Sequence, residues 1–302
     1  MADCFFMHYP VIRSSLIKFR LMKRSILFLG ITMISVNSFA QEFWLNPQKY
    51  FYIIRETANI RFVTGGDYTG RNPADNKQQI AQLVYYTPSD SILNISNRIP
   101  ANKGDSLPLP LHEDGTHMLI LTSGNSITRQ DAEKFNAALK ENGLDDIIRY
   151  RKEHGEENTE GIEQYRQCAK TILQVNGKLT DACTLPTSLP LDIIPEENPY
   201  SIPNPSSDRK PVKLRFRVVF KGEALGNVLV KALYQLPGKE ARMDSARTNR
   251  KGWVILERHP GPYLLRCMHM ERAPKGDKAD WQSYRGSLSF EYSQFFTRDG
   301  GR

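Results

Sequence analysis

The sequence predicts a mainly β protein with two β-sandwich domains of Ig-like scale, the first of which carries a helical insertion of two to three helices. Three observations support this fold class. Residues 42–122 contain short aromatic and β-branched runs between turn clusters, residues 128–174 change to helical spacing, and residues 212–268 alternate apolar and polar side chains. Short strands at regular spacing, separated by turns, are typical of antiparallel sandwiches.

The first domain is predicted to cover residues 41–195. Its strand-like runs share a high content of aromatic and β-branched residues, which suit a half-buried pleated surface. Glycine, asparagine and proline lie between these runs and favour turns. The predicted strands are residues 43–45, 50–54, 59–63, 81–87 and 117–122.

The helical insertion is predicted at about residues 128–174. Its first four residues, 128–131, resemble a capping box, with Asp131 in the position usually taken by Glu or Gln. Apolar residues follow at helical spacing until a glycine provides a C-terminal stop. A second helix is predicted over residues 144–154 and a third over about residues 161–173.

Residues 196–211 are rich in proline, serine and asparagine, and they are predicted to link the two domains. Residues 212–302 are predicted to form the C-terminal Ig-like sandwich. Its first strand has apolar side chains at the even positions from Leu214 to Phe220 and basic side chains at the odd positions from 213 to 217. This period of two predicts a strand with one buried face.

The N-terminal region resembles a secretory signal peptide. A basic pair, Lys23 and Arg24, precedes an apolar run at residues 26–34 that is too short to span a bilayer as one helix. Small residues at positions 38 and 40 then suit a signal peptidase. We therefore expect export to the periplasm or cell envelope.

Cleavage is predicted after Ala40, so that residues 1–40 are removed and residues 22–40 are the signal peptide proper. The true start is either Met1 or Met22. No second long apolar run follows, so the mature chain is expected to have no transmembrane span.

Removal of this region also changes the charge. The whole chain has 41 Lys and Arg, 33 Asp and Glu, and a net charge of +8. The removed segment holds five basic residues and one acidic residue, which leaves 36 and 32 and a net charge of about +4. This even balance, without a basic stripe, argues against nucleic acid as a partner.

Motifs typical of catalysis are missing from the sequence. It contains no nucleophile elbow, phosphate-binding loop or dinucleotide fingerprint, and its carboxylates form no distinctive pair. We therefore expect a protein that is not an enzyme.

Three cysteines remain after export: Cys168, Cys183 and Cys267. The periplasm permits a disulfide, so a bridge between Cys168 and Cys183 is one alternative. Three buried thiols are the other.

Two groups of residues are candidate metal ligands. The run 267–270 (CMHM) gathers thiol, thioether and imidazole groups, and Cys267 and His269 would share one face of a strand. The alternative is a core strand whose sulfur-containing side chains pack. The weaker candidate is the pair His112 and His117, which flank an Asp-Gly turn.

Aromatic residues provide a further candidate, a surface that binds carbohydrate or a protein partner. Most of them suit the cores of two sandwiches better, and Trp281 is expected to be the exposed one. The set consists of Phe43, Trp44, Tyr50, Phe51, Tyr52, Trp253, Tyr263 and Trp281.

Several motifs, taken in order, resemble one family. Its members are secreted two-domain bacterial proteins of unknown function, which are associated by similarity with the periplasmic component of cobalt or nickel uptake. Residues 41–47 (QEFWLNP) resemble the family's mature start, His-Glu-Phe-Trp-Leu. Residues 189–195 (LPLDIIP) resemble its interdomain join, and residues 269–270 with 279–281 (ADW) resemble its second domain. The resemblance covers essentially the whole mature chain.

The resemblance implies a β-rich periplasmic protein that binds a divalent transition metal, nickel or cobalt. The ligands that it implies are His269, Glu42 and Gln41, with Gln41 in the place of the family's N-terminal His. An N-terminal Gln can cyclise and lose its amine, so this departure weakens the chelate.

We therefore expect an exported, non-enzymatic binding or accessory protein of the cell envelope, with nickel or cobalt as candidate ligand and no certain cofactor. The alternative is an Ig-like interaction module that binds an outer-membrane or other envelope protein, or a glycan.

Overall fold

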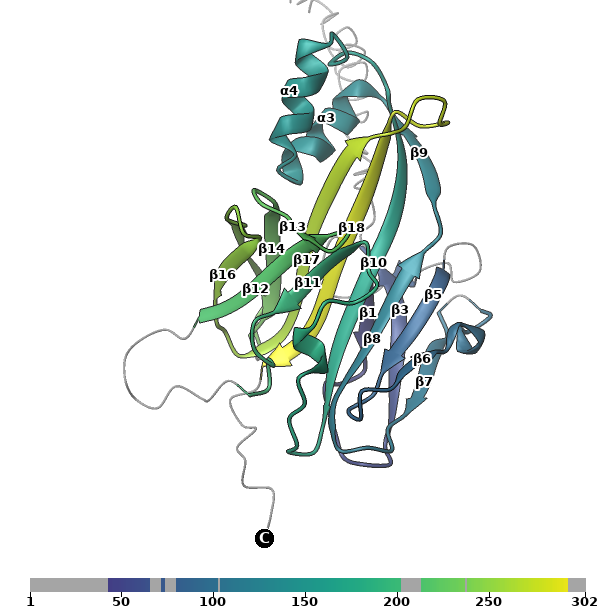
Figure 1. Ribbon diagram of the computed structural model, residues 1–302, viewed down its shortest axis with the longest axis vertical. Helices are drawn as coiled ribbons and strands as arrows, with labels where there is room; N and C mark the ends of the chain where they lie inside the picture. The colour runs from purple at the N-terminus through teal and green to yellow at the C-terminus, as the bar shows by residue number, and fades with distance from the viewer. Residues whose placement is uncertain are drawn as a thin grey trace, which may run out of the picture. The chain divides into compact units, whose positions relative to one another are not determined.

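The computed structural model describes residues 43–65, 72–73, 80–102, 104–201, 213–236 and 238–292 (Figure 1). The predicted signal region, Gln41, Glu42 and residues 202–211 of the predicted linker lie outside these ranges. The described residues belong to one compact unit, residues 39–302. None of their helices is long and apolar enough to cross a membrane.

Among the described residues, the largest of three β-sheets has ten strands and is here called the central sheet. Two short ones, β2 (Phe51–Tyr52) and β9 (Ser126–Gln130), pair with β10. The others follow one another across the sheet in the order β15 (Ala241–Arg247), β14 (Leu229–Gln235), β17 (Gly261–Arg272), β18 (Trp281–Tyr292), β10 (Gly161–Val175), β8 (Gly115–Ser123), β5 (Ile80–Tyr86) and β6 (Ile92–Asn94).

The two smaller sheets have four described strands each. In the N-terminal sheet β3 pairs with the other three strands, and in the C-terminal sheet β12 does so. The N-terminal sheet consists of β1 (Phe43–Pro47), β3 (Thr57–Thr64), β4 (Asn72–Pro73) and β7 (Ser106–Pro110). The C-terminal sheet consists of β11 (Leu191–Pro195), β12 (Lys213–Phe220), β13 (Glu223–Ala224) and β16 (Trp253–Glu257).

The two small sheets cover opposite faces of the central sheet. In β10, Ala169 and Leu173 pack with the N-terminal sheet, whereas Cys168 and Ile172 pack with the C-terminal sheet. Because successive side chains of a strand point to opposite faces, this split places one small sheet on each side. Figure 1 shows β11 and β12 crossing in front of β17 and β18.

The central sheet contains strands from both sides of the predicted linker. β10 pairs in parallel with β18, with Glu163 opposite Trp281 at one end and Thr171 opposite Ser289 at the other. The mainly β fold class is confirmed, whereas the division into two Ig-like domains at residues 196–211 stays a prediction.

Two of the three predicted helices are present, α3 (Ala132–Glu141) and α4 (Asp145–Glu153). The start of α3 differs from the predicted capping box. Asp131 is itself the N-cap and accepts a hydrogen bond from the Lys134 amide at 2.9 Å, because residues 126–130 belong to β9. The helices bury Phe135, Leu139, Leu144 and Ile147 against Met268, Met270 and Trp281.

The third predicted helix, residues 161–173, is wrong, because Gly161–Val175 form strand β10. The local spacing fits a helix, but β10 pairs with β8 and β9 on one edge and with β18 on the other. Long-range pairing of this kind overrides a local pattern. A Cβ at Gly161 would lie 2.2 Å from the Phe135 ring, so a glycine there allows α3 to pack closely.

The strands predicted at residues 43–45, 59–63, 81–87 and 117–122 correspond to β1, β3, β5 and β8. In β12 the predicted alternation is also observed. The even positions from Leu214 to Val218 are buried, and the basic residues between them are exposed.

A buried ion pair joins the central and C-terminal sheets. The side chains of Lys170 in β10 and Asp192 in β11 are 1% and 0% exposed and contact each other directly. Lys170 Nζ also donates to the Ile193 carbonyl at 3.2 Å. The second carboxylate oxygen of Asp192 accepts hydrogen bonds from the Thr187 amide and hydroxyl, both at 2.9 Å.

Candidate functional site

No disulfide joins the cysteines within the described part of the chain, where Cys168, Cys183 and Cys267 are buried thiols. Of the two alternatives that the sequence left open, the structure therefore agrees with three buried thiols. Burial raises the pKa of the Cys168 and Cys183 thiols to about 12. Because the thiolate is the ligating and nucleophilic form, neither group is prepared to bind a metal or attack a substrate.

His269 lies on β17, on the face of the central sheet that packs with the C-terminal sheet. Its ring centroid is 4.4 Å from that of Phe220, and Tyr284 is its cross-strand neighbour on β18. Burial lowers the pKa of the His269 imidazole below its ordinary 6.5, although the Glu271 carboxylate acts in the opposite direction. The imidazole is therefore neutral near pH 7, which is the form that ligates metals.

Other ligands do not gather around His269 in the ranges that the structure describes, where no three His, Cys, Asp or Glu side chains could hold one metal ion together. Cys267 shares the face of His269, as predicted, but is enclosed beside Gly286: a Cβ at Gly286 would lie 3.1 Å from its sulfur. Gln41 and Glu42 lie outside the described residues.

The chain enters the described structure on the opposite face of the central sheet from His269. Phe43 is the first described residue, and its carbonyl accepts a hydrogen bond from the Ser287 hydroxyl at 2.9 Å. Ser287 alternates along β18 with Leu288, which packs with the C-terminal sheet.

His112 and His117, the second candidate pair of metal ligands, differ in burial. His112 is exposed, whereas His117 is 1% exposed. Both ring nitrogens of His117 have partners: Nδ1 bonds to the Tyr85 hydroxyl, and Nε2 lies 2.9 Å from the Glu113 carbonyl. Burial lowers the pKa of the His117 imidazole. This histidine is held as a core residue of β8.

Most of the aromatic candidates belong to the core. Trp281, which was expected to be exposed, is 1% exposed. Its ring meets that of Tyr150 edge-on at 5.6 Å, and the Arg272 guanidinium lies 4.8 Å from its centroid. The expectation fails because α4 covers the start of β18. Phe43, Trp44, Tyr50, Tyr52 and Tyr263 are also buried, whereas Phe51 and Trp253 are partly exposed.

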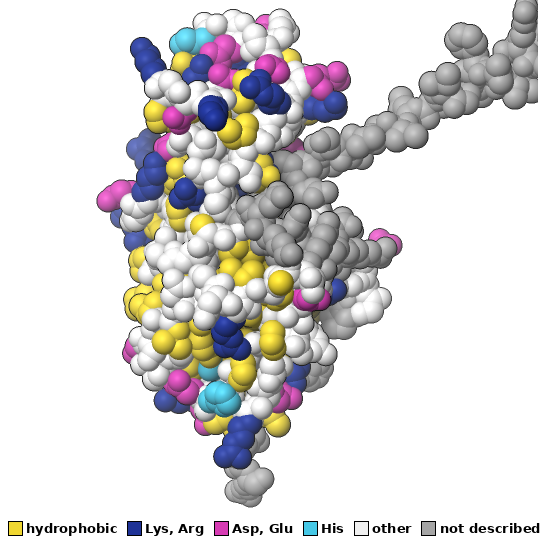
Figure 2. Space-filling model, turned by 90° about the vertical axis from the view of Figure 1, so that its right-hand side faces the viewer, with side chains coloured by type: hydrophobic (Ala, Val, Ile, Leu, Met, Phe, Trp, Pro, Cys, Tyr) yellow, Lys and Arg dark blue, Asp and Glu magenta, His cyan; other side chains and the backbone are white. Residues whose placement is uncertain are grey.

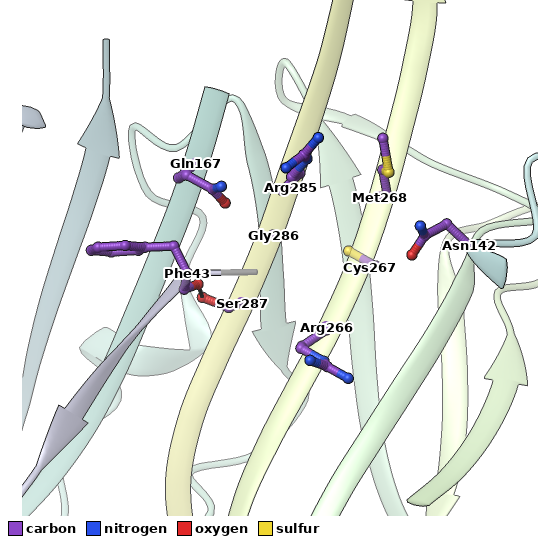
Figure 3. A pocket seen from close by; sticks show the side chains of 9 residues that line it. All are labelled: Phe43, Asn142, Gln167, Arg266, Cys267, Met268, Arg285, Gly286 and Ser287. Carbon is purple, nitrogen blue, oxygen red and sulfur yellow. Dashed lines mark hydrogen bonds between the residues drawn. The ribbon is translucent and has the colours of Figure 1, made fainter. Parts of the chain in front are cut away.

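A small pocket, called the arginine pocket, lies between β1, the end of α3 and the central strands (Figure 3). Figure 3 shows Gln167, Arg285 and Arg266 on three neighbouring strands, with Phe43 to one side and Asn142 to the other. Cys267, Met268, Gly286 and Ser287 complete its lining.

The arginine pocket is rich in buried polar groups. Gln167, Arg266 and Arg285 are 4%, 6% and 7% exposed. Arg285 donates to Glu163 at 2.7 Å and lies over the Tyr165 ring at 4.3 Å. The Gln167 side-chain oxygen has no hydrogen-bond partner among the described residues. With a volume of about 20 Å³, the pocket has room for one water molecule but not for an organic ligand.

A larger pocket, called the polar pocket, has a volume of about 110 Å³. The parallel register of β10 and β18 creates it, because Gln164 lies beside Gln282 and Arg166 beside Tyr284. Tyr284 is also the neighbour of His269, so both lie in the same region of the sheet. The lining consists of Asn125, Gln164, Arg166, Gln282, Ser283 and Tyr284.

Hydrogen-bonding groups dominate the polar pocket. Arg166 is the one charged residue in its lining, and its Nε donates to the Asn125 side-chain oxygen at 3.0 Å. The lining contains no His, Cys, Asp or Glu. The pocket can therefore bind a polar ligand.

Charged side chains of both signs are interspersed on the face that Figure 2 shows, with hydrophobic side chains between them.

The sequence interpretation did not identify the polar pocket. The sequence interpretation assigned Gln164 and Arg166 to a helix. That assignment does not place them beside Gln282 and Tyr284, their neighbours on β18. The available signal was that residues 167–175 lack a regular alternation of apolar and polar side chains, because a strand buried on both faces need not alternate.

Comparison with known proteins adds a family but no activity. The search of curated proteins gives no match. A family model described as "Domain of unknown function (DUF4198)" matches residues 38–271, which include both helices and every strand from β1 to β16. The match does not test the association with nickel or cobalt. Because it covers more than half of the sequence, the chain belongs to the DUF4198 family of domains of unknown function.

Proposed function

We propose that the protein is an exported, non-enzymatic binding protein of the cell envelope that holds a small hydroxyl-rich ligand, such as a sugar residue of a glycan. The lining of the polar pocket carries this proposal, because it combines amide, guanidinium and phenol groups. Export rests on the signal-like sequence of residues 22–40.

Amide side chains suit a sugar because sugar hydroxyls donate and accept hydrogen bonds, and each amide carries both a donor and an acceptor. Gln164 and Gln282 are register partners on adjacent strands. Their backbones are therefore about 4.8 Å apart, close enough for both amides to contact one ring. The Tyr284 ring adds an apolar surface for the C–H groups of a sugar.

Binding without catalysis is favoured by the groups that the pocket lacks. Glycoside hydrolysis requires two carboxylic acid groups on either side of the scissile bond. The six lining residues include no carboxylate. A ligand in this pocket would be held and released unchanged.

Glycan screening of the mature protein, followed by titration calorimetry, tests the proposal. We expect at least one oligosaccharide to bind, and Gln164→Ala and Gln282→Ala each to weaken binding about fivefold, because one hydrogen bond contributes ~1 kcal/mol. Gln235→Ala, at an exposed position of β14, is the matched control. A protein that binds no glycan, or that is weakened equally by the control, contradicts the proposal.

A divalent metal at His269 is a second candidate, favoured by the neutral, half-buried imidazole of this residue. Calorimetry with nickel or cobalt ions should then show binding that His269→Ala abolishes. His154→Ala, which removes an exposed imidazole on the C-terminal side of α4, should leave binding unchanged. Absence of binding at micromolar metal would exclude this candidate.

A further inference from the structure

The outer edge of the central sheet at β15 is open. β15 is the last strand of the sheet, and among the described strands it pairs with β14 alone. Five of its seven residues are exposed, and Met243 is 58% exposed. An edge of this kind presents unpaired backbone N–H and C=O groups to another strand.

The register with β14 determines which residues of β15 present these groups. The Thr248 amide donates to the Val228 carbonyl, and the same register continues with Leu229 opposite Arg247. Hydrogen bonding alternates along an antiparallel pair. The even-numbered residues of β15 therefore bond to β14, and Ala241, Met243 and Ser245 direct their backbone groups outward.

We propose that two copies of the chain associate through their β15 edges, antiparallel to each other, with Met243 of one copy opposite Met243 of the other. The sequence of β15 is self-complementary in this register, because Arg242 of each copy lies opposite Asp244 of the other. These two pairs occupy the non-hydrogen-bonded positions, where side chains approach most closely.

The neighbouring registers that keep the same backbone pattern are unfavourable. If one β15 strand slides by two residues in one direction, Asp244 of one copy lies opposite Asp244 of the other. If it slides by two residues in the other direction, Arg242 lies opposite Arg242. Like charges directly opposite each other destabilise a strand pair. The charges of β15 therefore select one register.

Both faces of the joined edge are compatible with this pairing. Asp244 contacts His259 Nε2 at 3.1 Å, but its side chain remains 38% exposed and can accept a further bond from an arginine. On the other face the two Met243 side chains would cover each other, which removes an exposed apolar group from water. The contact is isologous and closes as a twofold dimer.

Cysteine cross-linking tests the register. In the proposed dimer the two copies of residue 243 have Cα atoms about 5.5 Å apart, within the range for a disulfide. Met243→Cys should therefore form a covalent dimer on mild oxidation. Ser245→Cys should not, because the two copies of residue 245 would be about 14 Å apart. Cross-linking through residue 245, or through neither residue, would overturn the proposal.

Charge reversal tests the pairing independently by analytical ultracentrifugation. Arg242→Glu should raise the dimer dissociation constant at least about tenfold, equivalent to ~1.4 kcal/mol. The double variant Arg242→Glu with Asp244→Arg should restore it, because the opposite charges are exchanged. Lys213→Glu, at an exposed position of β12, makes the same charge change elsewhere and should have no effect.

A backbone variant separates pairing from folding. Ser245→Pro removes an outward N–H and leaves the bonds to β14 intact, so the chain should fold with unchanged circular dichroism but remain monomeric. A wild-type protein that is monomeric throughout the micromolar range, or a Ser245→Pro variant that still dimerises, would show that the Arg and Asp residues only protect an edge strand from association.

Discussion

Replacing Lys170 with methionine removes the cation of the buried ion pair and keeps most of the side-chain volume. Asp192, which is 0% exposed, would then keep its two hydrogen bonds from Thr187 but lose its counter-charge. Removing one partner of a buried pair costs about 3–5 kcal/mol. In a protein of this size we expect a fall in Tm of about 6–12 °C for the lower value.

The assay is equilibrium unfolding in urea, followed by circular dichroism, for two single variants and one double variant. Lys170→Met should lose about 3 kcal/mol of unfolding free energy, whereas Lys170→Met with Asp192→Leu should recover most of it, because an apolar pair is often no less stable. Lys213→Met, at an exposed position, should change stability by less than about 0.5 kcal/mol. A loss below about 1 kcal/mol in Lys170→Met, or no recovery in the double variant, would refute the reasoning.

Three further predictions concern buried groups. Gly161→Ala should lower the unfolding free energy in urea by about 1–3 kcal/mol, because the new Cβ would lie 2.2 Å from the Phe135 ring; an unchanged midpoint would contradict this packing. Stability should decrease as the pH falls below 6.5, because His117 and His269 each take up a proton in the unfolded chain while their lowered pKa keeps the native imidazoles neutral. A Tm-against-pH series should flatten in part in His117→Gln and further when His269→Gln is added. Cys168 and Cys183, whose pKa burial raises to about 12, should react with a thiol reagent at mildly alkaline pH only after denaturation, and rapid labelling of the folded protein would contradict their burial.

The sequence predicted those parts of the fold that depend on local pattern. The alternation of β12 identified its buried face because one side of this strand packs on the core and the other side is solvated. The helices α3 and α4 were also identified, because each has an apolar face long enough to detect. Most of the aromatic residues were correctly assigned to the core.

Features that depend on long-range pairing were not predicted. β10 has a neighbour on each edge, and both of its faces are covered, so its sequence lacks the alternation of a one-sided strand. The same error hid the polar pocket, since the pocket requires β10 beside β18. Trp281 was misplaced for a similar reason: the polar residues next to it suggested exposure, but Tyr150 of the helix that covers it lies 131 positions earlier in the chain.

The parallel pairing of β10 with β18 has a consequence for the order of folding. Thr171 and Ser289, which meet in this pairing, are 118 positions apart. The N-terminal part of the chain therefore cannot complete the central sheet until β18 has been synthesised, and contacts so distant in sequence form slowly. A fragment that ends before residue 202 would leave one edge of β10 unpaired from Glu163 to Thr171, which is a template for aggregation. The exported protein that we propose would therefore have to stay unfolded until β18 has also been translocated, and then fold as a whole.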